Sequence, residues 1–309
     1  MCGIVAYVGH SPAFPVVIDG LKRLEYRGYD SAGIATVEPN GDLVLNKKKG
    51  KVSDLLSHIN GDNPVGTIGI GHTRWATHGP PNDVNALPHR GASNRIAIIH
   101  NGIIENFAAI KESLKCRGHN LQSDTDSEVL AHLIEEVMDT SSLDLFDAVR
   151  AALSQVVGAY AIVVIDRENP GRLIAARKSS PLVIGIGEDG AYYVASDATP
   201  IVSHTKNVVY LEDEEVANLD LENGLKIHTI SNDVITPEVH ALEIELESIE
   251  KGGYEHFMLK EIFEQPQSIR DSIRGRINLQ LGELKMQGID DHWDKWSSTS
   301  RIIILGCGT

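Results

Sequence analysis

The chain begins Met1-Cys-Gly-Ile-Val-Ala-Tyr-Val8, a cysteine followed almost at once by a short apolar run. The run Ile4–Val8 is apolar at consecutive positions, which indicates a strand with both faces covered. Similar runs recur along the chain, each bounded by Gly, Pro, Asn or Asp as strands commonly are. They are Ile34–Val37, Ile68–Ile70, Ile96–Ile99, Ala161–Ile165, Leu182–Ile186, Tyr192–Ala195 and Val208–Leu211. We therefore predict stacked sheets, or sheets that carry helices.

Two segments between these runs have the period of a helix. Apolar residues recur at four-residue spacing from Asp126 to Met138, and the pattern continues from Leu145 to Val156. Thr125, followed three residues later by Glu128, predicts a capping box at the start of the first helix. Strands, two helices and more strands together predict a layered α+β arrangement.

Composition and charge exclude several classes of partner. The chain has 309 residues, with 28 Lys and Arg against 43 Asp and Glu, and its formal net charge is −15. This surplus argues against a broad grip on nucleic acid or on an anionic membrane, and no apolar stretch approaches the roughly 18 residues of a membrane span. The three cysteines, Cys2, Cys116 and Cys307, have unrelated spacings and form no disulfide framework. We expect a cytoplasmic protein without a nucleic-acid or membrane partner.

The composition changes near residue 240, which predicts a main domain over residues 2–240 and a linker with an interdomain helix over 241–300. That helix is predicted from Tyr254 to about Phe263, before Pro266 interrupts it. The final stretch, Arg301-Ile-Ile-Ile-Leu-Gly-Cys-Gly-Thr309, is typical of a buried strand that leads into a glycine-rich turn, as at the start of a βα unit. Because a lone strand leaves its backbone without partners, residues 301–309 are expected to open a truncated second domain.

Cys2 has a chemical possibility that other cysteines lack. A small residue at position two favours removal of Met1, which would leave one residue with both a thiol and a free α-amino group. Their ordinary pKa values are about 8.5 and about 8, so the amine can accept the thiol proton near neutral pH. Cys2 would then be both nucleophile and base. The alternative is that Cys2 is only a small apolar residue at the start of a strand.

The segment Gly71-His-Thr-Arg-Trp-Ala-Thr-His-Gly79 is predicted to be a loop directly after the strand at 68–70. Arg74 is suited to bidentate binding of a carboxylate, although such a loop can also be a solvated turn with a surface ion pair. The histidines at 72, 78, 89 and 100 are spaced by 6, 11 and 11 residues, which matches no standard metal site. We therefore predict neither a metal nor a cofactor.

Two further features complete a possible site. The Asn101 amide and the Gly102 backbone N–H could hold an oxyanion, but Asn-Gly is also the favoured sequence of a type I′ turn. Asp126 could interact only with the helix dipole, or it could bind an ammonium group. Together, a thiol with its own base, an oxyanion hole, a carboxylate-binding arginine and an ammonium-binding aspartate would meet the needs of glutamine amide hydrolysis.

Five motifs occur in order along the chain: Cys2-Gly-Ile-Val5, Glu25-Tyr-Arg-Gly-Tyr-Asp-Ser-Ala-Gly33, His72-Thr-Arg-Trp-Ala-Thr-His-Gly79, His100-Asn-Gly-Ile-Ile-Glu-Asn106 and Thr125-Asp-Ser-Glu128. With them the chain resembles the class II glutamine amidotransferases. Within that family, Tyr26-Arg-Gly-Tyr29 and Arg74-Trp-Ala-Thr-His78 resemble the branch that makes an amino sugar from fructose 6-phosphate.

The resemblance implies an N-terminal-nucleophile hydrolase fold, a four-layer αββα sandwich, followed by a linker and the first strand of an α/β sugar-isomerase domain. It implies that Cys2 is the nucleophile and that Asn101 and Gly102 form the oxyanion hole. Arg74 and Asp126 become the partners of the glutamine carboxylate and ammonium groups. Thr77 and His78 would line the same site, and Trp75 would gate the passage of ammonia.

The resemblance also implies glutamine as substrate, fructose 6-phosphate as a second substrate held by the missing sugar-isomerase domain, and a homodimer at full length. This chain is expected to hydrolyse glutamine without making the amino sugar. Three alternatives stay open. One is a class II amidotransferase with another acceptor, and another is a non-catalytic glutamine-binding module. The third is a different amide hydrolase of the same fold, such as a penicillin or bile-salt acylase, against which Arg74 and Asp126 argue.

Overall fold

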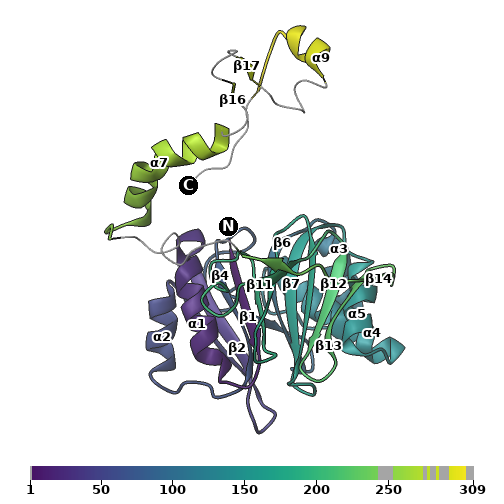
Figure 1. Cartoon of the computed structure of the whole chain (residues 1–309). Helices are drawn as coiled ribbons and strands as arrows, with labels where there is room; N and C mark the ends of the chain where they lie inside the picture. The colour runs from purple at the N-terminus through teal and green to yellow at the C-terminus, as the bar shows by residue number, and fades with distance from the viewer. Residues whose placement is uncertain (1, 243–252, 274–276, 279–282, 285–291, 304–309) are drawn as a thin grey trace. The chain divides into compact units, whose positions relative to one another are not determined.

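The computed structural model describes residues 2–242, 253–273, 277–278, 283–284 and 292–303 (Figure 1). The chain divides into two compact units, Met1–Ile244 and Glu245–Thr309. Both large sheets belong to the first unit.

The first unit contains two antiparallel sheets, whose strand orders are β15-β11-β9-β10-β1-β4-β2-β3 and β14-β13-β12-β8-β7-β6-β5. The first sheet consists of β1 (Gly3–Val8), β2 (Ser31–Val37), β3 (Leu43–Lys49), β4 (Ile68–Arg74), β9 (Val183–Ile186), β10 (Tyr192–Ala195), β11 (Asn207–Tyr210) and β15 (His240–Ala241). The second consists of β5 (His89–Arg90), β6 (Ile96–Ile104), β7 (Gly158–Asp166), β8 (Arg172–Lys178), β12 (Glu215–Asp220), β13 (Gly224–Thr229) and β14 (Val234–Ile235). Every apolar run predicted as a strand lies wholly or largely within one of them.

Helices cover the outer face of each sheet (Figure 1). The helices on the first sheet are α1 (Ala13–Leu24) and α2 (Val52–Ile59), and a 3-10 turn, η1 (Glu25–Arg27), follows α1. Those on the second sheet are α3 (Phe107–Cys116), α4 (Asp126–Ser141) and α5 (Leu145–Leu153). The predicted α+β class with stacked sheets that carry helices is therefore confirmed.

The alternation of side chains along the strands explains the consecutive apolar runs. Ile4 and Ala6 of β1 belong to the core between the two sheets, whereas Val5 and Tyr7 belong to the core beneath α1 and α2. Successive side chains of a strand point to opposite faces, so a strand covered on both sides is apolar at every position. The same alternation holds along β6, whose two faces meet the inter-sheet core and α4.

One segment considered as a turn and one predicted as a loop are strands in the structure. Asn101 and Gly102 lie inside β6, where they pair with Ala161 and Tyr160 of β7, which excludes the alternative of a type I′ turn. β4 likewise continues through Arg74, so only the last part of the predicted 71–79 loop lies outside a strand. In both places pairing with strands distant in sequence outweighs the local turn preference.

The start of α4 forms only half of the predicted capping box. The Thr125 hydroxyl accepts a hydrogen bond of 3.4 Å from the backbone N–H of Glu128. The Glu128 carboxylate turns instead to the backbone N–H groups of Gln122 and Ser123, at 2.8 and 2.6 Å. It therefore ties the segment before the helix to the first turn. The second helix, α5, ends at Leu153 and so is shorter than predicted.

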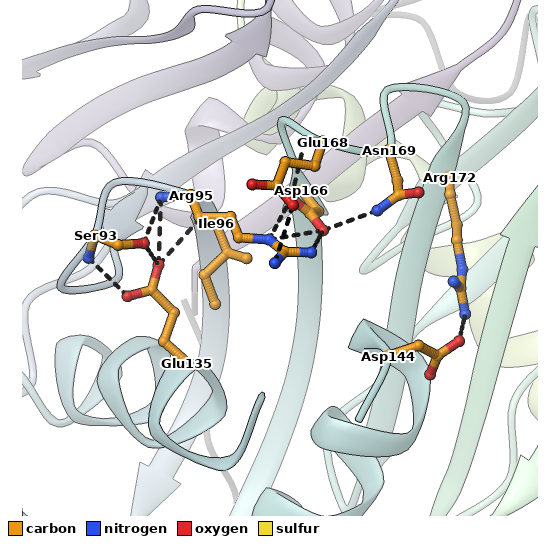
Figure 2. A network of polar contacts seen from close by, with 9 residues as sticks. All are labelled: Ser93, Arg95, Ile96, Glu135, Asp144, Asp166, Glu168, Asn169 and Arg172. Atoms are coloured by element: carbon orange, nitrogen blue, oxygen red, sulfur yellow. Dashed lines mark hydrogen bonds and ion pairs between the residues drawn. The ribbon is translucent and has the colours of Figure 1, made fainter. Parts of the chain in front are cut away.

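A polar network fastens one end of β6 to its neighbours (Figure 2). Glu135 of α4 accepts hydrogen bonds from the backbone N–H groups of Ser93 and Arg95, at 2.8 and 3.3 Å. The Arg95 guanidinium in turn binds Asp166 at the end of β7, with Nη2 and Oδ2 2.7 Å apart, and the Asp166 side chain is fully buried. Ion pairs and backbone bonds therefore hold α4, β6 and β7 together at the end of β6 far from Asn101.

The second unit contains α7 (Phe257–Ile273), α9 (Trp293–Ser297) and the short strands β16 (Ile277–Asn278) and β17 (Glu283–Leu284). Pro266 lies inside α7, so the predicted interruption is wrong. The proline lacks the N–H that would bond to the carbonyl of Ile262, and because Ile262 is exposed, water can satisfy that carbonyl. Residues 301–303 are irregular and exposed, with no described strand beside them, so the predicted strand does not form there. The rest of that prediction, residues 304–309, lies outside the described residues.

Candidate active site

All the predicted site residues line one cavity of about 250 Å³ in the first unit. They are Cys2, Arg74, Trp75, Thr77, His78, Asn101, Gly102 and Asp126. The residues that share the cavity with them are Arg27, His72, Leu87, His100, Ile103, Thr125, Ser127, Ser180, Pro181 and Ser196. The site therefore draws on both sheets and on the start of α4.

Strand pairing places Cys2 in the cavity. Gly3 of β1 is opposite Thr73 of β4, so Cys2 lies beside the point where the chain leaves β4. There the backbone N–H of Trp75 donates a hydrogen bond of 3.2 Å to the Cys2 Sγ. Burial raises the pKa of the Cys2 thiol above its ordinary value. The sulfur is therefore a thiol at neutral pH, and a base must remove its proton before or during any attack.

Asn101 and Gly102 lie directly opposite Cys2 on the second sheet. The Asn101 Nδ2 donates a hydrogen bond of 3.0 Å to the Cys2 carbonyl oxygen, so this bond crosses from one sheet to the other. Gly102 has a φ of 133°, and a Cβ atom there would collide with the carbonyl of Ala159. A glycine is thus required where the strand turns its backbone toward the cavity.

Arg74 is a buried cation with an unused donor. Its Nη2 donates hydrogen bonds to the carbonyl oxygens of His78 and Gly79, the latter at 3.3 Å. These bonds attach the loop after β4 to the Arg74 side chain. Its Nη1 is buried and has no hydrogen-bond partner among the described residues. Burial lowers the pKa of Arg74, but a guanidinium stays charged under all ordinary conditions. A ligand carboxylate would satisfy this donor.

Asp126 supplies a buried carboxylate to the same cavity. It is the first residue of α4 and is only 4% exposed. Its Oδ2 accepts a hydrogen bond of 2.9 Å from the backbone N–H of Ile104, which joins α4 to the end of β6. The cavity therefore contains a positive group, Arg74, and a negative group, Asp126, as the two ends of an α-amino acid require.

The loop after β4 borders the cavity. Trp75 is 46% exposed, and its ring meets that of Tyr29 edge-on, with centroids 5.5 Å apart. The backbone N–H of Ala76 donates a hydrogen bond of 2.8 Å to the Asp30 carboxylate. Thr77 is exposed, whereas the ring of His78 packs edge-on against Phe107 of α3. Main-chain contacts therefore hold this loop in place while the side chains of Trp75 and Thr77 stay accessible.

Sequence reasoning considered His72 and His100 only as possible metal ligands. Both are buried at the cavity, and burial lowers the pKa of both, that of His72 to about 3. The spacing along the strand could have shown that His72 is buried, because Ile68, Ile70 and His72 alternate along β4 and so share its inward face.

Within the described part of the chain, no group of three or more His, Cys, Asp or Glu side chains is placed to hold a metal. Every helix described is too short or too polar to cross a lipid bilayer.

Comparison with known proteins gives the same family throughout. A model described as a glutamine amidotransferase domain matches residues 72–203. The chain is 53% identical over 309 residues to the glutamine–fructose-6-phosphate aminotransferase (isomerizing) of Bacteroides thetaiotaomicron. It is 47% identical over 311 residues to the protein of the same name from Pyrococcus horikoshii. Each match covers 100% of this chain and 50% of the relative, so the chain spans about half the length of these curated relatives.

Solved structures agree with the sequence relatives. The glutamine phosphoribosylpyrophosphate amidotransferase from B. subtilis superposes with a TM-score of 0.64 at 30% identity, covering 75% of this chain and 50% of that chain. A glutamine aminotransferase class-II domain protein from Silicibacter pomeroyi gives 0.51 at 18% identity, covering 74% and 99%, and shows the fold alone. The two antiparallel sheets and these matches together define a class II glutamine amidotransferase domain. Over its whole length the chain is a homologue of the isomerizing glutamine–fructose-6-phosphate aminotransferases.

Proposed function

We propose that this chain hydrolyses the side-chain amide of glutamine, with Cys2 as the nucleophile of an N-terminal-nucleophile hydrolase. The observation that carries the proposal is the cavity around Cys2, which contains a free guanidinium donor on Arg74 and a buried carboxylate on Asp126. The layers of the first unit fit the four-layer αββα arrangement of that fold class. The glutamine amidotransferase family match supports the same conclusion.

Glutamine would bind by its α-amino acid end. Its carboxylate takes the Nη1 donor of Arg74, and its ammonium group takes the carboxylate of Asp126. Thr77 and His78 line the same cavity. This placement directs the side-chain amide toward Cys2, which directly precedes β1 of the first sheet, whereas Asp126 begins α4 on the second sheet.

Attack begins with proton transfer. Removal of Met1 frees the α-amino group of Cys2, which takes the thiol proton as Sγ bonds to the amide carbon. An internal base is needed because burial keeps the thiol protonated. The carbonyl π electrons move to oxygen, and the Asn101 Nδ2 and the Gly102 N–H stabilise the resulting oxyanion.

Collapse of the intermediate breaks the carbon–nitrogen bond. The Cys2 ammonium returns its proton to the leaving nitrogen, so ammonia departs and a glutamyl thioester remains. Water then gives a proton to the amine and attacks the thioester. Glutamate leaves as the proton passes to the thiolate, which restores the starting enzyme.

In a longer protein this ammonia would serve a second reaction. The relatives named as fructose-6-phosphate aminotransferases suggest fructose 6-phosphate as acceptor and glucosamine 6-phosphate as product. Trp75, exposed beside the cavity, would gate the ammonia. In this proposal residues 2–240 form the glutaminase domain, 241–300 the linker and 301–309 the start of a sugar-isomerase domain. The complete enzyme would be a cytoplasmic homodimer.

The test combines product analysis with covalent labelling. Incubated with glutamine and fructose 6-phosphate, the chain should release glutamate and ammonia but no glucosamine 6-phosphate. A glutamine-analogue electrophile should label Cys2 on peptide mapping. The Cys2→Ala variant should lose hydrolysis, whereas Cys116→Ala, at the exposed end of α3, should keep it. Label on Cys116 or Cys307 instead, or parental hydrolysis by Cys2→Ala, would overturn the proposal.

A further inference from the structure

His72 makes a direct contact with Asn101 across the interface of the two sheets. His72 continues the inward face of β4 and Asn101 that of β6, so the two side chains meet between the sheets. The His72 Nε2 and the Asn101 Oδ1 are 2.9 Å apart. His72 is 1% exposed, so no bulk water competes for this contact. It is part of no step derived above.

The partners of Asn101 determine which atom donates in this contact. The Cys2 carbonyl oxygen can only accept a hydrogen bond, so the Asn101 group facing it at 3.0 Å must be the Nδ2 amino group. The amide oxygen therefore faces His72, and because that oxygen can only accept, the His72 Nε2 must be protonated. The contacts thus select one amide orientation and one imidazole tautomer together.

The imidazole stays neutral in this environment. Burial is the largest effect and lowers the pKa of His72 to about 3. The nearby Arg74 and His100 side chains act in the same direction, and together with burial they outweigh the hydrogen bonds to Asn101 and to the His100 backbone, which favour the charged ring. A neutral ring has a single N–H, which is used on Asn101. The hydrogen bond between His72 and Asn101 is therefore expected to stay unchanged between about pH 5 and pH 9.

We propose that His72 is a positioning residue, which fixes the Asn101 amide so that its Nδ2 faces Cys2 and the cavity. One Nδ2 hydrogen is used on the Cys2 carbonyl. The second has no partner among the residues that the structure describes and can donate into the cavity that Asn101 lines. Without the imidazole donor, a half-turn of the amide would present an oxygen to the developing oxyanion. This inference rests on the proposed function for the role of that second hydrogen.

The first experiment compares His72→Leu with His72→Gln in the whole chain. Leucine removes the donor and should lower kcat for glutamine hydrolysis by about tenfold to a hundredfold while KM stays near the parental value, as for other residues that hold a catalytic group in place. Glutamine retains an N–H₂ donor and should recover most of that loss. Alkylation of Cys2 by iodoacetamide forms no oxyanion and should proceed at the parental rate in both variants. His58→Leu, an exposed histidine on α2, is the matched control and should behave as the parent.

The second experiment needs no substrate. Nitrogen-15 NMR of the histidine rings should show His72 as the Nε2–H tautomer with no titration between about pH 5 and pH 9. The Nδ1–H tautomer, or titration in that range, would overturn the inference. So would parental kcat in His72→Leu, or equal losses in the leucine and glutamine variants. If the parent chain fails to hydrolyse glutamine, the proposed function is wrong, and the NMR measurement still decides the His72–Asn101 contact.

Discussion

The Cys2 Sγ accepts a hydrogen bond of 3.2 Å from the Trp75 backbone N–H and lies 3.4 Å from the carbonyl oxygen of the same residue. The backbone of one residue, Trp75, therefore meets both functions of the thiol, as acceptor and as donor. A thiolate can only accept, so ionisation would forfeit the contact with the carbonyl. The position of the Cys2 sulfur therefore depends on the backbone conformation of the loop after β4.

The first prediction concerns the pH dependence of Cys2 reactivity. Because burial raises the pKa of the thiol, a chain that retains Met1 should react with iodoacetamide increasingly as the pH rises, with its midpoint above the ordinary thiol value of about 8.5. Removal of Met1 places an ammonium group on Cys2 itself, which favours the thiolate and should shift the profile to lower pH. Mass spectrometry of alkylation rates in a Cys116→Ser, Cys307→Ser background measures both profiles. Coincident profiles would show that the amine does not influence the thiol.

The second prediction concerns Arg74. Lysine in its place keeps the charge but loses the fork of donors that holds the loop carbonyls and the ligand at once. We expect Arg74→Lys to raise KM for glutamine by about tenfold or more. Steady-state kinetics measures this, with iodoacetamide labelling of Cys2 as a control for an intact nucleophile. A parental KM would exclude Arg74 as the carboxylate partner.

The third prediction compares two glycines of positive φ. At Gly102, with φ 133°, an added Cβ would strike the Ala159 carbonyl, whereas at Gly118, with φ 93°, it would meet nothing within 4 Å. Gly118→Ala should cost only the backbone strain, about 1 kcal/mol, and should keep full activity. Gly102→Ala should lose far more stability and most glutamine hydrolysis. Thermal unfolding and activity assays of both variants distinguish the collision from the strain, and equal effects would contradict this account.

The fourth prediction concerns the network in Figure 2. Arg95→Met would leave the buried Asp166 carboxylate without its cation, so we expect a loss of about 2–3 kcal/mol in the free energy of unfolding. Arg117→Met removes a more exposed arginine, paired with Glu136 at 3.0 Å, and should cost about 1 kcal/mol or less. Urea unfolding measures both. Similar losses in the two variants would mean that burial of Asp166 does not govern the effect.

Local sequence patterns predicted much of this fold. The apolar runs correctly predicted strands, because a strand that is covered on both faces needs an apolar residue at every position. Thr125 marked the start of α4 because a cap needs only residues three positions apart. Several elements were not predicted individually. Among them are the helices α1 and α2 and the strand β3, whose second half, Asn46–Lys49, is polar and so lacks the apolar pattern of the other strands. The apolar faces of α1 and α2 are buried only because these helices pack on the first sheet.

By itself, the sequence determined the chemistry that this protein can attempt. The second-position cysteine, the arginine at 74, the Asn-Gly pair and the aspartate at 126 are properties of residue type and order. Only the tertiary structure decided that Asn101 and Gly102 continue a strand, and that His72 on the other sheet meets the Asn101 amide. The reason is that these contacts join strands far apart in sequence, whose pairing minimises unsatisfied backbone groups over the whole sheet and overrides the preference of any two neighbouring residues.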